Sequence, residues 1–303
     1  MGRHIVTTAV EHHAVLNCCQ QLEQEGWEVT TILPDQNGDI SAESVLAAVR
    51  PDTALVSVMM VNNELGSIYP IADIAKGLKA VNEKTLLHTD AVQGFLKVPF
   101  SAKALGADFI AISGHKVGAP KGIGALYVRR GTRFRPYLKG GHQERGRRAG
   151  TENVPYIIGL GKACELAASN MEKERTQVAA LRDRLQAGLL AAIPHCKING
   201  DQEHRLPNTL NISFEGVEGE ALLLQLDQYR ICASSGSACT SGSLEPSHVL
   251  RAMGVPFNYA HGSVRFSLSR YNTEAEIDRV IEVMPGIVSE LRAISPFASF
   301  IKK

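Results

Sequence analysis

The chain has 303 residues, of which 44% are hydrophobic and 21% are charged, and these values exclude small stapled scaffolds and intrinsically disordered proteins. Its formal net charge of +1 provides no basic field for nucleic acid and no polybasic anchor for a membrane. The N-terminus lacks an apolar signal sequence, and no later run is apolar enough to span a membrane. Six cysteines without a C-x-x-C pair indicate neither a disulfide framework nor a zinc site. We therefore expect a cytoplasmic protein with no metal, nucleic acid or membrane partner.

The first half alternates short β-rich runs with helical patterns, which is typical of a mostly parallel sheet covered by helices. The predicted strands are Ile5 to Thr8, Glu28 to Leu33, Leu55 to Met59, Leu86 to His88, Phe109 to Ser113 and Gly124 to Val128. The predicted helices are Ala14 to Glu25, Ser41 to Val49 with Ser41 as N-cap, and Ile71 to Asn82. In such sheets the carboxyl ends of the strands line the ligand crevice. We therefore expect convergence of three polar clusters that follow strands, Asn62-Asn63-Glu64, Thr89-Asp90 and Gly114-His115-Lys116.

The second half begins after a basic, glycine-rich stretch, Arg129 to Gly150, which predicts a long loop or a linker. A helix is expected from Pro155 to about Ala168, followed by leucines at helical spacing. The remaining predicted elements are strand Thr209 to Phe214, helix Glu220 to Gln228, strand Ile231 to Ala233, a helical turn from Pro246 to Met253, strand Val264 to Leu268 and helix Thr273 to Val283. The pattern predicts a large α/β domain over residues 1–160 and a smaller α+β domain over residues 161–303.

Asp90 and Lys116 each come directly after a predicted buried strand, so a carboxylate and an amine can face the same crevice. Pyridoxal phosphate needs such a pair, because a lysine binds it covalently and an acid keeps its pyridine nitrogen protonated. The neighbouring Gln93, Ser113 and His115 can bind a ring oxygen and a phosphate. Spacing alone favours another interpretation, in which Asp90 caps the next helix and Lys116 is an ordinary surface lysine.

The loop from Ser234 to Ser243 consists of small residues and contains one reactive side chain, Cys239. Since such a loop cannot pack a core, we expect Cys239 to be an exposed nucleophile, with an incidental thiol as the alternative. Arg265 lies among apolar residues of a strand and predicts either a bond to a substrate carboxylate or a structural salt bridge. The other cysteines are expected to be small apolar fillers: Cys18, Cys19, Cys164, Cys196 and Cys232.

Six motifs occur in order along the chain: Glu11-His12-His13-Ala14-Val15, Asn62-Asn63-Glu64, His88-Thr89-Asp90-Ala91-Val92-Gln93, Ser113-Gly114-His115-Lys116, Arg148-Ala149-Gly150-Thr151 and Ser234 to Ser241. In these motifs the sequence resembles the cysteine desulfurases of the class V aminotransferase family, and most closely their NifS-like and IscS-like branch. The resemblance covers essentially the whole chain. It implies an aspartate aminotransferase-like α/β fold, pyridoxal 5'-phosphate as cofactor, L-cysteine as substrate and a homodimer. An iron-sulfur scaffold or another sulfur acceptor protein would be its partner.

The resemblance also implies a role for each matching residue. The catalytic residues would be Cys239, Lys116 and His12. The cofactor would be bound by Lys116, Asp90, Gln93, Ser113, His115, His12, Thr151 and Asn63. The substrate carboxylate would be bound by Arg265 and Asn63. Cys239 would take the sulfur as a persulfide for iron-sulfur cluster assembly, nitrogenase clusters included, while alanine is released.

The start of the chain departs from the family pattern. Family members carry an N-terminal segment and then a glycine-threonine turn, at a helix start, whose amides bind the cofactor phosphate. Only Met1 to His4 precede the first predicted strand, so we expect the large domain to be N-terminally incomplete. Two other functions stay open: another class V activity, such as selenocysteine lyase or aminotransferase, and an inactive remnant that acts as a binding subunit.

Overall fold

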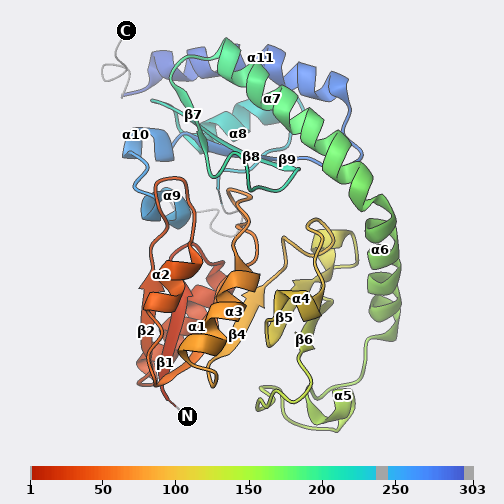
Figure 1. The fold of residues 1–303 in the computed structure, drawn as a ribbon. Coiled ribbons are helices and arrows are strands. Elements are labelled where there is room, and N and C mark those ends of the chain that lie inside the picture. The colour runs from red at the N-terminus through yellow and green to blue at the C-terminus, as the bar shows by residue number, and fades with distance from the viewer. Residues whose placement is uncertain (1, 237–244, 297–303) are drawn as a thin grey trace.

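The computed structural model describes residues 2–236 and 245–296, which form two separate sheets with surrounding helices (Figure 1). The first sheet has six strands in the order β2-β1-β3-β4-β5-β6. These strands are β1 (His4–Thr8), β2 (Glu28–Ile32), β3 (Thr53–Ser57), β4 (Leu86–Asp90), β5 (Phe109–Ser113) and β6 (Gly124–Val128). Neighbouring strands are parallel except for β6, which runs antiparallel to β5. The carboxyl ends of β1 to β5 therefore lie at one edge of the sheet.

Helices follow the strands of the first sheet along the chain, and local sequence explains where several of them begin and end. They are α1 (His13–Gln24), α2 (Ala42–Ala47), α3 (Ile71–Val81), α4 (Ala102–Leu105), the 3₁₀ turn η1 (Gly114–Val117) and α5 (Gln143–Gly146). Ser41 caps α2 as predicted, since its Oγ accepts a hydrogen bond from the Ser44 amide at 3.0 Å. Gly118 ends η1 with φ at +87°, a backbone conformation that favours glycine.

The second sheet has three antiparallel strands, β7 (Cys196–Asn199), β8 (Thr209–Phe214) and β9 (Ser263–Ser267), in the order β7-β8-β9. Its helices are α8 (Gly219–Gln228), α9 (His248–Ala252), α10 (Phe257–Ala260) and α11 (Glu274–Ile294). The helix α6 (Val154–Lys173) continues through a π-helical segment, η2 (Glu174–Val178), into α7 (Ala179–Ala192). In Figure 1 this long helical run follows one side of the molecule from the first sheet to the second.

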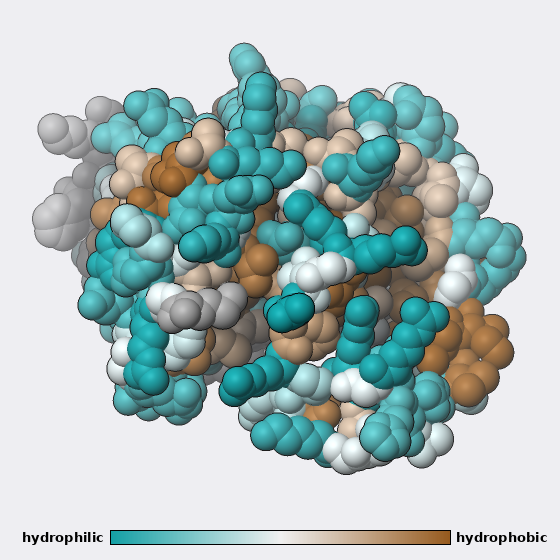
Figure 2. Space-filling view, turned by 60° about the horizontal axis from the view of Figure 1, so that its bottom comes forward, coloured by the Kyte–Doolittle hydropathy of each residue, from teal (hydrophilic) through white to brown (hydrophobic). Residues whose placement is uncertain are grey.

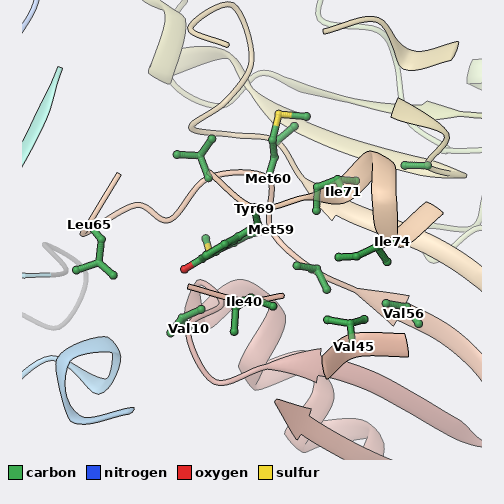
Figure 3. Close-up of a cluster of buried hydrophobic side chains, with 14 of the residues drawn as sticks. Val10, Ile40, Val45, Val56, Met59, Met60, Leu65, Tyr69, Ile71 and Ile74 are labelled. Carbon is green, nitrogen blue, oxygen red and sulfur yellow. The ribbon is translucent and has the colours of Figure 1, made fainter. Parts of the chain in front are cut away.

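Each sheet has its own hydrophobic core. The first core joins β1, β3 and β4 to α2 and α3, and Figure 3 shows part of it around Tyr69, whose hydroxyl donates a hydrogen bond to the Gly38 carbonyl at 3.0 Å. The second core joins β8 and β9 to α7, α8 and α11. Val249, Leu250 and Met253, in and just after α9, pack in the first core although they are remote from it in sequence. Contacts of this kind hold the two sheets together.

The predicted α/β fold with a mostly parallel sheet is confirmed, and so are most of its elements. Two differences from the prediction concern strands. Ile231 to Ala233 is not a strand, because only Ser234, beyond it, forms an isolated bridge, to Arg265. The strand β7 was not predicted. The division into residues 1–160 and 161–303 stays a prediction, and α6 crosses that boundary without a break. Within the described residues, every helix is too short or too polar to span a bilayer.

Candidate active site

Asp90 is the last residue of β4, and Lys116 lies in η1, directly after the neighbouring strand β5. One carboxylate oxygen of Asp90, Oδ1, accepts a hydrogen bond from the Val92 amide at 2.9 Å. Asp90 thus acts as a cap through one of its oxygens, as the alternative interpretation predicted, although the segment it caps consists of turns and is not a helix. The other oxygen forms no hydrogen bond within the described part of the chain. Lys116 is exposed, so an amine and a carboxylate stand at the same sheet edge.

The turn Asn62-Asn63-Glu64 lies next to Asp90, because the Met60 amide donates a hydrogen bond to the Asp90 carbonyl at 2.8 Å. Asn62 shapes the turn: its Oδ1 accepts hydrogen bonds from the amides of Glu64 and Leu65, both at 2.9 Å. These contacts, together with the pairing of β4 and β5, bring the three predicted polar clusters to one edge of the sheet.

Arg265 connects the second sheet to this edge. It lies in the middle of β9, and its guanidinium NH1 donates a hydrogen bond to the Asn63 carbonyl at 2.7 Å. Its charge also acts on Glu64. Burial raises the pKa of Glu64, whereas the hydrogen bond from Ser247 and the charge of Arg265 lower that pKa. Arginine binds a carboxylate through two parallel hydrogen bonds, so this position suits recognition of an amino-acid carboxylate.

Ser113 and His115 lie on either side of the turn into η1, and Ser113 Oγ and His115 Nδ1 are 2.8 Å apart. Partial burial lowers the pKa of His115, and the charges of Lys116 and Lys121 lower it further. These positive charges and polar groups together favour a bound anion. The pair therefore suits a phosphate group beside Lys116.

His12 is half-buried at the N-cap of α1, where its Nδ1 accepts a hydrogen bond from the Ala14 amide at 3.1 Å. The preceding Glu11 is fully buried. Its Oε1 accepts hydrogen bonds from the Met59 amide and the Thr8 hydroxyl, both at 2.8 Å. Burial raises the pKa of Glu11 to about 8, and the charge of Asp90 contributes to the rise. The first motif thus reaches the same region as Asp90.

Lys97 is a residue of this site that the sequence did not single out. Its Nζ donates a hydrogen bond to Gln93 Oε1 at 3.0 Å. The pKa of Lys97 is lowered to about 8, mainly by burial; the charges of Lys116 and Arg265 also lower it, and Glu174 in η2 acts in the opposite direction. The sequence holds one feature that could have identified Lys97: it comes four residues after Gln93 and lies among the apolar residues of the run Phe95 to Val98.

Two predicted residues remain apart from this cluster. Thr151 is exposed in the segment before α6, and it forms no hydrogen bond to the cluster within the described residues. Cys239 lies outside the described residues. The described residues on either side of its segment are tied to the cluster, because Ser234 bridges to Arg265 and Ser247 Oγ donates a hydrogen bond to Glu64.

The prediction that the other cysteines are apolar fillers is wrong for two of them. Cys18 and Cys232 are exposed, whereas Cys19 is buried and Cys164 and Cys196 are intermediate. An exposed position on α1 places Cys18 on the solvent side of that helix, and Cys232 lies in irregular chain after α8. All five of these thiols are free.

The site fits a phosphate-bearing, pyridine-containing cofactor. Three of its buried side-chain oxygens have no hydrogen-bond partner within the part of the chain that the structure describes: Thr89 Oγ1, Asn63 Oδ1 and Glu64 Oε1. Such atoms usually have a protein, water or ligand partner. The cations Lys97, Lys116 and Arg265 suit the phosphate and a substrate carboxylate, and Asp90 suits a protonated ring nitrogen.

Comparisons with known proteins agree with this chemistry. The aminotransferase class-V family pattern matches residues 1–280. A cysteine desulfurase of Nostoc sp. is 60% identical over 295 residues, which cover 97% of this chain and 73% of the relative. The cysteine desulfurase NifS of Azotobacter vinelandii is 56% identical with the same coverage. A solved NifS-like protein is 39% identical with a TM-score of 0.89, covering 96% of this chain and 76% of that protein. The chain thus spans about three quarters of the length of these proteins.

Proposed function

The chain belongs to the class V aminotransferase family and, within it, to the cysteine desulfurases, and from that membership we propose how its residues convert L-cysteine to L-alanine. The observation that carries the proposal is the 60% identity to a cysteine desulfurase across 97% of the chain. The meeting of Asp90, Gln93, Ser113, His115 and Lys116 at one sheet edge supports it.

Pyridoxal phosphate, when bound, supplies an electron sink for the bonds at the Cα atom of an amino acid. In our proposal Lys116 holds it covalently, Asp90 pairs with its pyridine nitrogen and Gln93 binds its phenolic oxygen. Ser113 and His115 bind its phosphate, and their 2.8 Å contact beside Lys116 supports this role. His12 stacks on the ring, and Asn63 contributes a further polar contact, which its unpartnered buried Oδ1 supports.

The remaining residues act on the substrate. Arg265, held by the Asn63 carbonyl, binds the cysteine carboxylate and so orients the Cα proton toward Lys116. Lys116 Nζ takes that proton as a general base. Cys239 Sγ then attacks the substrate sulfur: the new sulfur–sulfur bond forms as the bond from sulfur to the substrate Cβ breaks. The carbon skeleton keeps the electron pair of the broken carbon–sulfur bond, takes a proton at Cβ, regains one at Cα from Lys116 and leaves as alanine, while Cys239 keeps the sulfur as a persulfide.

We propose that the persulfide sulfur passes to an iron-sulfur scaffold or another acceptor protein, and that two copies of the chain form a homodimer. Large apolar side chains exposed near the start of α6 support the dimer: Val154 is 55% exposed and Ile158 is 67% exposed. Figure 2 shows hydrophobic surface among hydrophilic residues on one face of the molecule. In such a dimer Thr151 reaches the phosphate at the partner's site. The five free thiols are in keeping with the reducing cytoplasm as its compartment.

The decisive experiment measures sulfide released from L-cysteine in the presence of a thiol reductant. We expect the protein reconstituted with pyridoxal phosphate to be yellow and active. Lys116→Ala should lose both the colour and the activity, whereas Cys239→Ala should keep the colour and lose sulfide release. Unchanged sulfide release by Cys239→Ala would contradict the mechanism. Faster transamination of a keto acid than sulfide release would favour an aminotransferase, and failure to bind any cofactor would favour a binding subunit.

The role of Arg265 gives a separate prediction. Arg265→Lys keeps the charge but loses the planar, two-pronged geometry, so we expect KM for L-cysteine to rise by about tenfold or more, with a smaller fall in kcat. Steady-state kinetics would measure both constants. The control is Arg279→Lys, because Arg279 is an exposed arginine of α11 paired with Glu282. An unchanged KM in Arg265→Lys would remove Arg265 from the substrate site.

A further inference from the structure

Lys97 carries a positive charge in an unusually enclosed position. It follows Asp90 by seven positions, in the turns after β4; the residue is partly buried, and burial is the main cause of the lowered pKa of its ammonium. Its hydrogen-bond acceptor is a neutral amide oxygen, Gln93 Oε1, at 3.0 Å. Removing an ammonium from water is costly unless a partner compensates it. The position of Lys97 therefore needs an explanation.

No carboxylate in the described part of the chain forms an ion pair with Lys97. Glu174 faces it from η2, but that carboxylate is 2.6 Å from the guanidinium of Arg270. The other charged groups that act on Lys97 are Lys116 and Arg265, and both are cations. Three cations from three separate elements thus face one region. Such an arrangement favours an anionic ligand.

The bond from Lys97 also constrains Gln93. A glutamine amide has an acceptor end and a donor end, whereas a lysine ammonium only donates. Because Lys97 donates to Oε1, the Nε2 end of Gln93 is left to donate to a different group. Gln93 lies three positions after Asp90, so its donor end belongs to the edge where the polar clusters meet. A single lysine thereby fixes which end of the amide is presented to a ligand.

We propose that Lys97 is a positioning residue for the cofactor: it fixes the amide of Gln93 so that Nε2 donates to the phenolic oxygen, and its charge stabilises the bound anionic cofactor. This inference rests on the proposed use of pyridoxal phosphate. The competing explanation is that Lys97 only fills space between the turns after β4 and η2. The two explanations differ in what they predict for the spectrum of the bound cofactor.

The test compares Lys97→Met and Lys97→Arg with the unaltered chain, each reconstituted with pyridoxal phosphate. The visible absorbance of the bound cofactor changes with pH when the nitrogen that joins it to Lys116 loses its proton. Loss of a nearby positive charge makes that proton harder to remove, so the pH midpoint of Lys97→Met should rise by about half a unit or more. Its dissociation constant for the cofactor should rise about tenfold, the effect of one charge-assisted hydrogen bond. Lys97→Arg, which keeps charge and donor, should restore most of both.

Controls separate this role from a structural one. Lys103→Met removes an exposed lysine of α4 and should leave midpoint and affinity unchanged. Without cofactor, Lys97→Met should melt no lower than the unaltered chain, because methionine removes a buried charge at similar length. If Lys97→Met does not fold, Gln93→Leu becomes the deciding variant, and it must weaken cofactor binding about tenfold.

Three outcomes would overturn the inference. The first is that Lys97→Met has the same pH midpoint and cofactor affinity as the unaltered chain. The second is that Lys97→Met has a lower melting temperature and an unchanged spectrum. The third is that Gln93→Leu binds the cofactor with normal affinity. An unaltered chain that binds no cofactor would instead overturn the proposed function, and this inference with it. The two failures are thus distinguished by the spectrum of the unaltered chain.

Discussion

The strands β1 and β6 belong to the same sheet and have opposite surroundings. All five residues of β1 are buried, whereas four of the five residues of β6 are exposed. The exposed strand β6 has the more apolar sequence, GALYV against HIVTT in β1, so composition does not explain the difference. β1 lies between β2 and β3, while within the described residues β6 pairs only with β5. Local sequence therefore decides that each segment is a strand, and its place in the sheet decides how much of it is buried.

The strands β1 and β6 also differ in what lies beside them. Next to β1 are buried polar groups of the candidate site, such as Glu11. Next to β6 is an apolar hollow of about 510 Å³, lined by residues that include Phe100, Ile112, Leu126 and Met171. Leu126 itself is 49% exposed. The candidate site thus spans both surroundings: Glu11 lies beside the buried strand β1, whereas Lys116 follows β5, the neighbour of β6.

The largest effect that this comparison predicts is at Val6, which is fully buried in β1. Val6→Asp places an unpaired charge in the first core, so we expect a loss of more than about 4 kcal/mol in the free energy of unfolding, or no folding at all. Urea unfolding followed by circular dichroism measures the loss. Val6→Ala is the control and should cost about 2 kcal/mol through a small cavity. A charge tolerated at Val6 would show that β1 is not part of a packed core.

Glu11 predicts a pH-dependent effect beside β1, smaller for each pH unit than the effect of Val6→Asp. Because burial raises its pKa from 4.5 to about 8, the folded protein holds this proton more tightly than the unfolded chain. The resulting stabilisation is complete below about pH 4.5, declines as pH rises from 4.5 to 8, and changes no further above 8. We expect the free energy of unfolding to fall through Glu11 by roughly 1.4 kcal/mol for each pH unit within that window.

Glu11→Gln tests this prediction, since its amide oxygen can still accept the hydrogen bonds from Met59 and Thr8. We expect urea unfolding at several pH values to give a flatter pH dependence between 4.5 and 8 than in the unaltered chain. The matched change Glu152→Gln, at an exposed glutamate, should leave that dependence as it is. If both variants retain the slope, Glu11 does not titrate in that range.

Sequence patterns were sufficient wherever the structure depends on neighbours along the chain. They located all six strands of the first sheet within two residues at each end, and the cap of α2 by Ser41 follows from its hydroxyl alone. They failed where distant segments decide. Ile231 to Ala233 has strand-like residues but no continuous partner, and only Ser234 bridges to β9. Lys97 was missed because its surroundings, Lys116 and Arg265, come from other elements.

The candidate site divides in the same way. The strand-end position of Asp90 and Lys116 could be predicted, because parallel strands bring their carboxyl ends to one edge. The contact of Arg265 with the Asn63 carbonyl could not, since it depends on how the second sheet packs against the first. The exposure of the Cys18 and Cys232 thiols could not be predicted either. The apolar character of cysteine favours burial, but the segments that carry these two residues leave them at the surface.

The smallest expected effect is at the open end of the sheet, where Leu126 in β6 is half exposed. Leu126→Asp adds a charge that water can reach, so we expect the free energy of unfolding to change by less than about 1 kcal/mol, against more than 4 for the same new side chain at Val6. Urea unfolding at low and high protein concentration measures it. If Leu126→Asp costs several kcal/mol, and more at high concentration, a second copy covers β6 in solution. The contrast between β1 and β6 would then hold only for the isolated chain.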